Sequence, residues 1–404
     1  MVVLYYSVIM TVTEGVLRDL IREDGRKIQS IMQFLKSRGL FKTLAQLENE
    51  TETQFHSTSL EEGSVLDEAL DLYWSKNNVV SPSEQTTPIS TLPIPGICAT
   101  EITQVFHEVH GSANPTALAW HPHLDNILVT GGADRRLIFR DIREGNQLGE
   151  VSLASPVLSM EWNYDKLFVG CMGGELYSLT VNETVAEYVP QLLGRPHGSK
   201  RITNIRGSTN GEFIATVAKD SCVHFTGGQS VPPIRCQRDV ASVCWIDSSK
   251  IVVAEIDNPL LTVWGLVDGK WKPEYELCMN LSLMDPRTAY TSLTMAWNAE
   301  YNLLATCTSR NSVLLFKIPD VCPIKTLYGM SVGTYDNPSI EFSQDGSYLY
   351  IASELRVMVF EVRSGHNVFD IPVSKSKSIR CMRRHPASDL LATVSFDHRL
   401  SVLV

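Results

Sequence analysis

The stretch TALAWHPHLDNILVTGGADRRLIFRDI, residues 116–142, decides the fold because its pattern returns along the chain. It holds three strand-like apolar runs, separated by a turn containing Pro122 and by a polar turn around Asp134. Short strands that repeat at intervals of roughly 40 residues cannot cover their apolar faces alone and stack on one another. The sequence therefore predicts a mainly β protein of seven stacked units, which span residues 116–142, 157–181, 202–227, 241–266, 291–318, 338–362 and 378–404.

The units resemble those of WD-repeat β-propellers, in which a turn with proline or Asp-Gly follows the first strand and a polar turn often holds aspartate. Arg140-Asp141 stands where that family has a Trp-Asp pair, and His110-Gly111 is a reversed form of its Gly-His pair. The resemblance covers roughly 300 residues. It implies a seven-bladed WD-repeat β-propeller over residues 101–404.

The two ends of the repeat region complement each other. The chain stops at Val404 within the third strand of the last unit, which leaves that unit without an outer strand. The strand-like stretch ITQVFHEV, residues 102–109, precedes the first unit and belongs to none. We therefore expect residues 102–109 to pair with residues 399–404 and close the ring, because closure removes exposed sheet edges between the first and last blades.

Helical periodicity precedes the repeats. The stretch KIQSIMQFLKSRGLFKTLAQLENE, residues 27–50, has apolar residues at helical spacing on both sides of Gly39, which can adopt the conformation that ends a helix. It resembles the LisH motif, a dimerisation element of two short helices, and residues 60–77 form a third helical candidate. The resemblance implies a small α-helical LisH-like domain over residues 13–80, with dimerisation residues Ile28, Ile31, Leu35, Gly39, Leu40, Leu44 and Leu47.

Such short helices bury too little surface to offset their ordering entropy and need a partner. A second copy of the chain, another subunit's helices and the propeller itself all remain open as that partner. Residues 1–12 form an apolar leader without a basic n-region or cleavage site, and Met1 and Met10 both fit as the natural start. Residues 81–100 are rich in proline, serine and threonine and are expected to form a linker.

Composition argues against several functional classes. The formal net charge of -10 disfavours a global attraction to nucleic acid or anionic membrane. The leader of about 12 residues is shorter than the roughly 20 residues that a helix needs to span a bilayer, so we expect no membrane insertion. Nine cysteines without a CxxC pair favour reduced thiols, as in the cytoplasm or nucleus.

No catalytic motif stands out in the sequence. It contains no Gly-rich phosphate loop and no G-x-S-x-G elbow. HEVH, residues 107–110, resembles a zinc motif, but histidines three apart on a strand point to opposite faces. We therefore expect no enzyme activity, no metal and no cofactor.

Cations gather where a WD-type propeller has the loops that enter each first strand and the turns that join second to third strands. These segments share one face, here named the upper face. Asp134, Asp220, Asp257, Asp285, Asp336 and Asp397 lie on the same segments, so an ordinary solvated rim is the alternative interpretation. The candidate partner-binding residues are Arg135, Arg136, Lys200, Arg201, Arg310, Lys377 and Arg399, whose charges suit acidic or phosphorylated segments.

LisH and propeller together resemble adaptor proteins of ubiquitin-ligase, dynein-regulatory, splicing and corepressor complexes. The resemblance implies a scaffold that forms a homodimer and binds protein partners as a subunit of a multiprotein complex. Two alternatives stay open: a monomeric propeller that docks to another subunit through its N-terminal helices, and a binder of acidic or phosphorylated peptides through the upper face.

Overall fold

The computed structural model describes residues 92–96, 98–180, 189–228, 230–280, 291–331 and 338–404. These residues form strands and contain no helix. The expected leader (1–12) and LisH-like domain (13–80), with all seven dimerisation residues, lie outside the described part of the chain. The described fold therefore consists of the repeat region and the short segment that precedes it.

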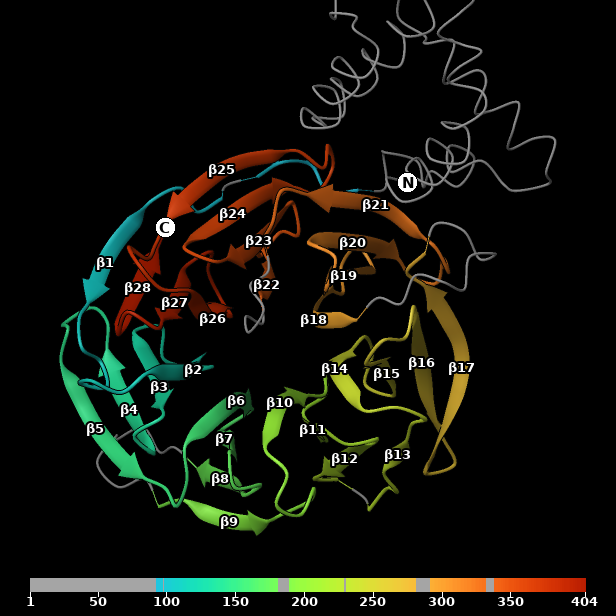
Figure 1. Ribbon diagram of the computed structural model, residues 1–404, viewed down its shortest axis with the longest axis horizontal. Coiled ribbons are helices and arrows are strands. Elements are labelled where there is room, and N and C mark those ends of the chain that lie inside the picture. Colours follow the sequence, from blue (N-terminus) through green and yellow to red (C-terminus); the bar gives the residue numbers. More distant parts are fainter. Residues whose placement is uncertain (1–91, 97, 181–188, 229, 281–290, 332–337) are drawn as a thin grey trace, which may run out of the picture. The chain divides into compact units, whose positions relative to one another are not determined.

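Seven four-stranded antiparallel sheets are arranged as blades around a central channel, as the repeats predict (Figure 1). Blade 1 contains β2 (Pro115–Trp120), β3 (Ile127–Gly132), β4 (Arg136–Asp141) and β5 (Gln147–Ser152); blade 2 contains β6 (Val157–Asn163), β7 (Lys166–Cys171), β8 (Leu176–Thr180) and β9 (Gln191–Gly194); blade 3 contains β10 (Ile202–Gly207), β11 (Ile214–Ala218), β12 (Cys222–Thr226) and β13 (Ile234–Arg235).

The remaining four blades follow the same order from the channel outward. Blade 4 contains β14 (Val240–Trp245), β15 (Lys250–Glu255), β16 (Leu260–Val267) and β17 (Lys270–Cys278); blade 5 contains β18 (Ser292–Asn298), β19 (Leu303–Thr308), β20 (Ser312–Lys317) and β21 (Pro323–Tyr328); blade 6 contains β22 (Ser339–Phe342), β23 (Tyr348–Ser353), β24 (Arg356–Glu361) and β25 (Asn367–Pro372). Blade 7 contains β26 (Ile379–Arg384), β27 (Leu391–Ser395), β28 (Arg399–Leu403) and, as its outer strand, β1 (Ile102–Phe106).

Blade 7 closes the ring as the sequence predicts. β1 pairs with β28 in an antiparallel register that places Phe106 opposite Leu400 and Ile102 opposite Leu403. The strand is shorter than the predicted stretch 102–109, because pairing ends at Phe106. Backbone hydrogen bonds continue the closure, since the N–H groups of Thr100 and Glu101 donate to the carbonyl of Val404.

The cores lie between blades, so no blade can cover its apolar faces alone. One buried cluster joins Val129 and Phe139 of blade 1 to Met160 and Val169 of blade 2. Another joins residues of blade 1 to those of blade 7 across the closure. The apolar faces of each blade are therefore buried only against a neighbouring blade, so the blades depend on one another for stability.

Side-chain hydrogen bonds tie neighbouring inner strands together around the channel. Hydroxyls of one blade donate to a carbonyl of the next: Thr116 to Val157 (2.6 Å), Ser159 to Ile202 (3.2 Å), Ser242 to Ser292 (2.9 Å) and Ser339 to Met382 (2.9 Å). The indole Nε1 of Trp120 donates to the carbonyl of Arg383, and that of Trp245 to the carbonyl of Arg206, each at 3.0 Å. These bonds run between blades rather than within them.

Described residues of the expected linker lie along blade 6. The backbone N–H of Gly96 donates to Ser347 Oγ at 3.2 Å, and that of Ala99 donates to the Tyr350 hydroxyl at 3.0 Å. Leu92 is buried within a core cluster of blades 5 and 6. This part of residues 81–100 therefore packs on the propeller before β1 begins.

Candidate functional site

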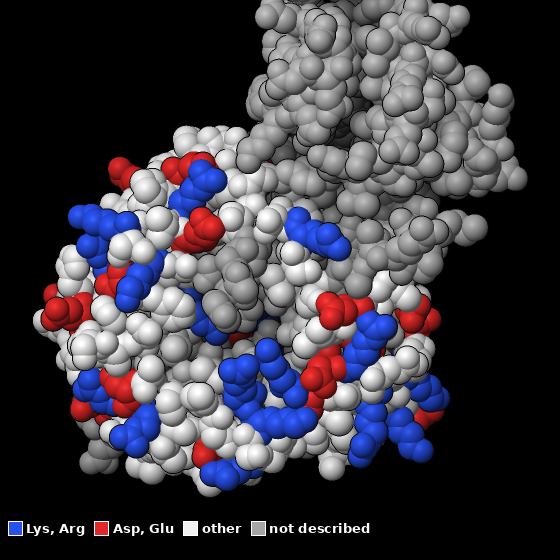
Figure 2. Space-filling model, viewed as in Figure 1, with Lys and Arg blue, Asp and Glu red and all other residues white. Residues whose placement is uncertain are grey.

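The upper face gathers the connections between blades and the turns between second and third strands, and Figure 2 views this face. Basic and acidic side chains are interspersed over it, with basic groups over the region of β10 and within the central opening (Figure 2). Four of the expected turn aspartates lie between second and third strands: Asp134, Asp220, Asp257 and Asp397. Asp285 and Asp336 lie outside the described residues.

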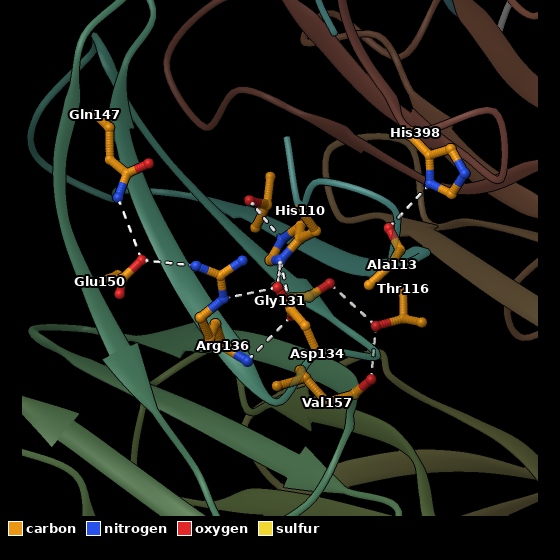
Figure 3. Close-up of polar contacts among 11 residues, drawn as sticks. His110, Ala113, Thr116, Gly131, Asp134, Arg136, Gln147, Glu150, Val157 and His398 are labelled. Carbon is orange, nitrogen blue, oxygen red and sulfur yellow. Dashed lines mark hydrogen bonds and ion pairs between the residues drawn. The ribbon is translucent and has the colours of Figure 1, made fainter. Parts of the chain in front are cut away.

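His110 and Asp134 form a buried hydrogen-bond network in blade 1 (Figure 3). The Nδ1 atom of His110 lies 2.9 Å from Asp134 Oδ1, and Nε2 lies 3.1 Å from the Thr130 hydroxyl. A carboxylate only accepts, so Nδ1 carries the proton and Nε2 accepts from Thr130. Burial lowers the pKa of His110, which favours a neutral ring at neutral pH.

Asp134 is further held by Arg136. The Arg136 Nε donates to Asp134 Oδ2 at 2.8 Å, and Nη1 donates to Glu150 at 3.0 Å (Figure 3). Burial alone would raise the pKa of Asp134, but interactions with His110 and Arg136 outweigh it and lower that pKa. Arg136 thus forms ion pairs inside blade 1. An acidic partner would have to compete with Asp134 and Glu150 for its guanidinium.

The other turn aspartates are engaged in the same manner. His197 Nδ1 lies 2.8 Å from Asp220 Oδ2. Asp397 accepts from the hydroxyls of Ser374 and Ser395 and lies 3.5 Å from Arg399 Nε. Asp257 accepts from the Thr291 hydroxyl at 3.3 Å. These carboxylates hold loops in place, although Asp239 of the β13–β14 connection remains exposed.

Several predicted cations point to solvent instead. Arg135, Lys200, Arg201 and Lys377 are exposed, and their side chains form no hydrogen bond or ion pair with the described residues. Arg310 is also exposed. On the upper face, Asp134 and Asp397 are therefore paired with arginines and Asp220 is held by a histidine, whereas several cations have exposed side chains.

Blade 3 brings three cations close in the fold. Lys200 and Arg201 directly precede β10, and Lys219 lies in the turn between β11 and β12, which belong to the same sheet as β10. All three side chains are exposed. Lys377 precedes β26, which lies across the central opening from β10 (Figure 1).

A cavity of about 80 Å³ with mostly polar walls lies in the channel. Its lining combines inner-strand hydroxyls with arginines, namely Thr116, Ser159, Thr203, Thr294, Ser339, Arg206, Arg380 and Arg383. Arg383 crosses between blades: its Nη1 donates to Glu341 at 3.0 Å, and its Nη2 lies 3.6 Å from Glu161. Arg206 Nη1 lies 3.5 Å from the same Glu161 oxygen. Two arginines and two glutamates thus form a balanced ionic network within the ring.

The described residues offer little for covalent or metal chemistry. No group of three or more metal-ligating side chains occurs among them. The thiols of Cys171, Cys236 and Cys244 have pKa values raised to about 12 by burial, which opposes thiolate reactivity. Within the described ranges no helix is long and apolar enough to cross a membrane. The arrangement suits recognition by hydrogen bonds and charge.

Comparison with known proteins gives a partial similarity that is consistent with this fold. No family model matches the chain. A segment of 116 residues is 31% identical to part of the B-type cell cycle switch protein ccs52B of Medicago truncatula. The match covers 27% of this chain and 23% of that relative, so the chain spans about a quarter of the relative's length. Seven four-stranded blades and this similarity support a WD-repeat β-propeller, a fold typical of protein-interaction scaffolds.

Sequence reasoning missed the channel network. Arg380 and Arg383 are three apart on one strand, a spacing that places side chains on opposite faces of a regular strand. A register shift between Ile379 and Cys381 leaves Arg380 unpaired in the ladder and turns it, like Arg383, toward the channel. Similar shifts occur in β2, β6, β10, β14 and β18, so the repeated bulge was a signal available only from the structure.

Proposed function

We propose that the chain is a non-enzymatic scaffold that binds acidic or phosphorylated protein segments through the upper face of its propeller. The supporting observation is the unequal engagement of charges on that face. Asp134, Asp220 and Asp397 are held by internal partners, whereas Lys200 and Arg201 have none among the described residues. A negatively charged segment would therefore meet the exposed cations Lys200, Arg201 and Lys219 before it meets these aspartates, and arginine forks suit carboxylates and phosphates.

Self-association is the second part of this proposal. The LisH-like stretch 27–50 would join two chains and place two propellers on one assembly. Linked binding faces raise avidity for a multivalent partner without new contacts. The chain would then act in the cytoplasm or nucleus as a subunit of a ubiquitin-ligase, dynein-regulatory, splicing or corepressor complex. The partial similarity to a cell cycle switch protein is in keeping with a regulatory complex.

Affinity purification of the tagged chain from its native cells, with mass spectrometry of co-purified proteins, tests the binding face. The variant Lys200→Glu with Arg201→Glu reverses two exposed charges beside β10. The matched control, Lys270→Glu with Lys272→Glu, reverses two exposed charges at the start of β17, away from these loops. We expect partners to be lost from the first variant and kept by the second. Equal recovery from both variants and the wild type would remove the upper face as the binding surface.

Light scattering during size-exclusion chromatography tests self-association. A dimer of the wild type and a monomer of Leu35→Asp would support the LisH-like contact, because a buried charge at an apolar interface opposes association. A monomeric wild type would instead favour docking of the N-terminal helices on another subunit. In that case Leu35→Asp should lose that subunit in the purification while its mass in isolation stays unchanged.

A further inference from the structure

Among the described residues at the mouth of the channel, one ionisable side chain lies in a ring of neutral ones. The bulged positions of successive inner strands line the cavity with Thr116, Leu158, Thr203, Leu293 and, in blade 7, Arg380. Pro338 occupies the matching position before β22. A bulge re-aims the side chain that it carries. Arg380 is therefore set into the cavity at the end of β26 that adjoins the upper face.

Arg380 differs from the two deeper arginines in having no counter-charge. Arg383 contacts Glu341 and Glu161, and Arg206 contacts Glu161, whereas no described carboxylate forms an ion pair with Arg380. The guanidinium of Arg380 is partly buried and has lost some of its hydration, and no described anion offsets the cost of this desolvation. An anionic group entering the mouth would supply that missing interaction.

The two arginines that have ion-pair partners lie deeper in the channel than Arg380. Arg383 lies three residues beyond Arg380, about 10 Å further along the strand. Its contacts with Glu341 and Glu161 join blade 7 to blades 6 and 2 at that level. A volume of about 80 Å³ is several times the roughly 10–15 Å³ that a cavity needs to hold one water. The cavity therefore has room for a group of the size of a carboxylate or phosphate.

Cations at the rim define a path across this mouth. Lys200 and Arg201 lie on one side of the opening, before β10, and Lys375 and Lys377 lie on the other, before β26 (Figure 1). Basic side chains stand at the rim and within the opening in Figure 2. A segment that crosses between these rims would pass directly over Arg380.

We propose that the channel mouth is an anion socket in which Arg380 holds one carboxylate or phosphate side chain of the bound protein segment. This inference rests on the proposed function, because it names the anchor within the same binding face. The rim cations attract and orient an acidic segment, and the socket selects the position of its anchoring residue. The socket adds a requirement that rim charge alone does not impose: one anionic side chain at a fixed place in the segment.

Fluorescence anisotropy with degenerate peptides tests the socket even though the natural partner is unidentified. Three fluorescein-labelled pools have random flanking positions and a fixed central residue, which is phosphoserine, glutamate or serine. The full chain is compared with Arg380→Gln, with the control Lys270→Gln and with Lys200→Glu plus Arg201→Glu. Thermal unfolding followed by circular dichroism establishes that each variant keeps the propeller.

For the wild type and Lys270→Gln we expect the phosphoserine or glutamate pool to bind at least about tenfold more tightly than the serine pool, as for a charge-assisted pair. Arg380→Gln should remove that preference. Retention of the preference by Arg380→Gln, with its loss in Lys200→Glu plus Arg201→Glu, would overturn the socket and leave the proposed function in place. A wild type that does not distinguish the three pools would overturn both.

Discussion

Replacement of Arg383 by methionine tests whether the ionic network stabilises the ring. Arg383 from blade 7 reaches Glu341 of blade 6 and Glu161 of blade 2. Burial alone would lower the pKa of Arg383, but Cys381 and these glutamates outweigh it and raise that pKa above its ordinary value. Methionine keeps much of the side chain's length while it removes the charge, so Glu341 would lose the ion pair that the structure gives it and Glu161 would keep only Arg206.

The expected cost follows from the partial burial of this network. Removal of one partner from a fully buried ion pair costs about 3–5 kcal/mol. The side chains of Arg383, Glu341 and Glu161 are 20%, 23% and 27% exposed, so solvent screens part of the interaction. We therefore expect Arg383→Met to lower the free energy of unfolding by about 2–3 kcal/mol.

Urea unfolding followed by tryptophan fluorescence measures this loss as a lower midpoint at unchanged slope. The variants Glu341→Gln and Arg383→Met with Glu341→Gln complete a double-mutant cycle, in which we expect a coupling of about 1 kcal/mol or more. Lys270→Met removes an exposed cation as a control. If Arg383→Met matched Lys270→Met within about 0.5 kcal/mol, or if the cycle were additive, the network would not stabilise the ring.

Three further outcomes follow from single contacts. Trp245→Phe should cost about 1 kcal/mol more than Trp297→Phe in urea unfolding, because only Trp245 Nε1 of this pair has a hydrogen-bond acceptor among the described residues. Tyr350→Phe should cost about 1–2 kcal/mol in the same assay, since it strands the buried N–H of Ala99, and equal stability would contradict that contact. Because burial lowers the pKa of His110 in the folded chain, the unfolded chain binds more protons below about pH 6.5. Stability should therefore decrease as the pH is lowered through this range. His110→Gln should reduce that pH slope, and an unchanged slope would show that His110 does not titrate with unfolding.

The sequence predicted the blades because their first three strands are buried and carry apolar runs. β27 and β28, for example, are buried along nearly their whole length. Outer strands gave a weaker signal, since β25 exposes four consecutive residues from Asn367 to Asp370, and β13 contains only two residues. The ring closure predicted the outer strand of blade 7, whereas the bounds of the other outer strands required the structure.

The candidate site was less predictable, for geometric reasons. The loop positions of Lys200, Arg201 and Lys377 followed from the order of the strands. Whether each charge was free or engaged did not, because Arg136 and Arg135 are adjacent in sequence but only Arg136 reaches Asp134 and Glu150. Contacts across the channel join strands far apart in the chain, and no local pattern encodes them.

The distribution of charge reconciles the acidic chain with the cationic binding surface that we propose. Net charge describes the field far from the protein, where the total of -10 dominates. At contact distance, screening at physiological salt confines each exposed charge to about 8 Å, so local engagement decides the potential. Asp134 and Asp220 are each held by a buried histidine, whereas Lys200 and Arg201 face solvent. The net charge therefore opposes anionic polymers at a distance, whereas the short acidic segment that we propose would meet, at the channel mouth, exposed cations and Arg380, which has no ion-pair partner among the described residues.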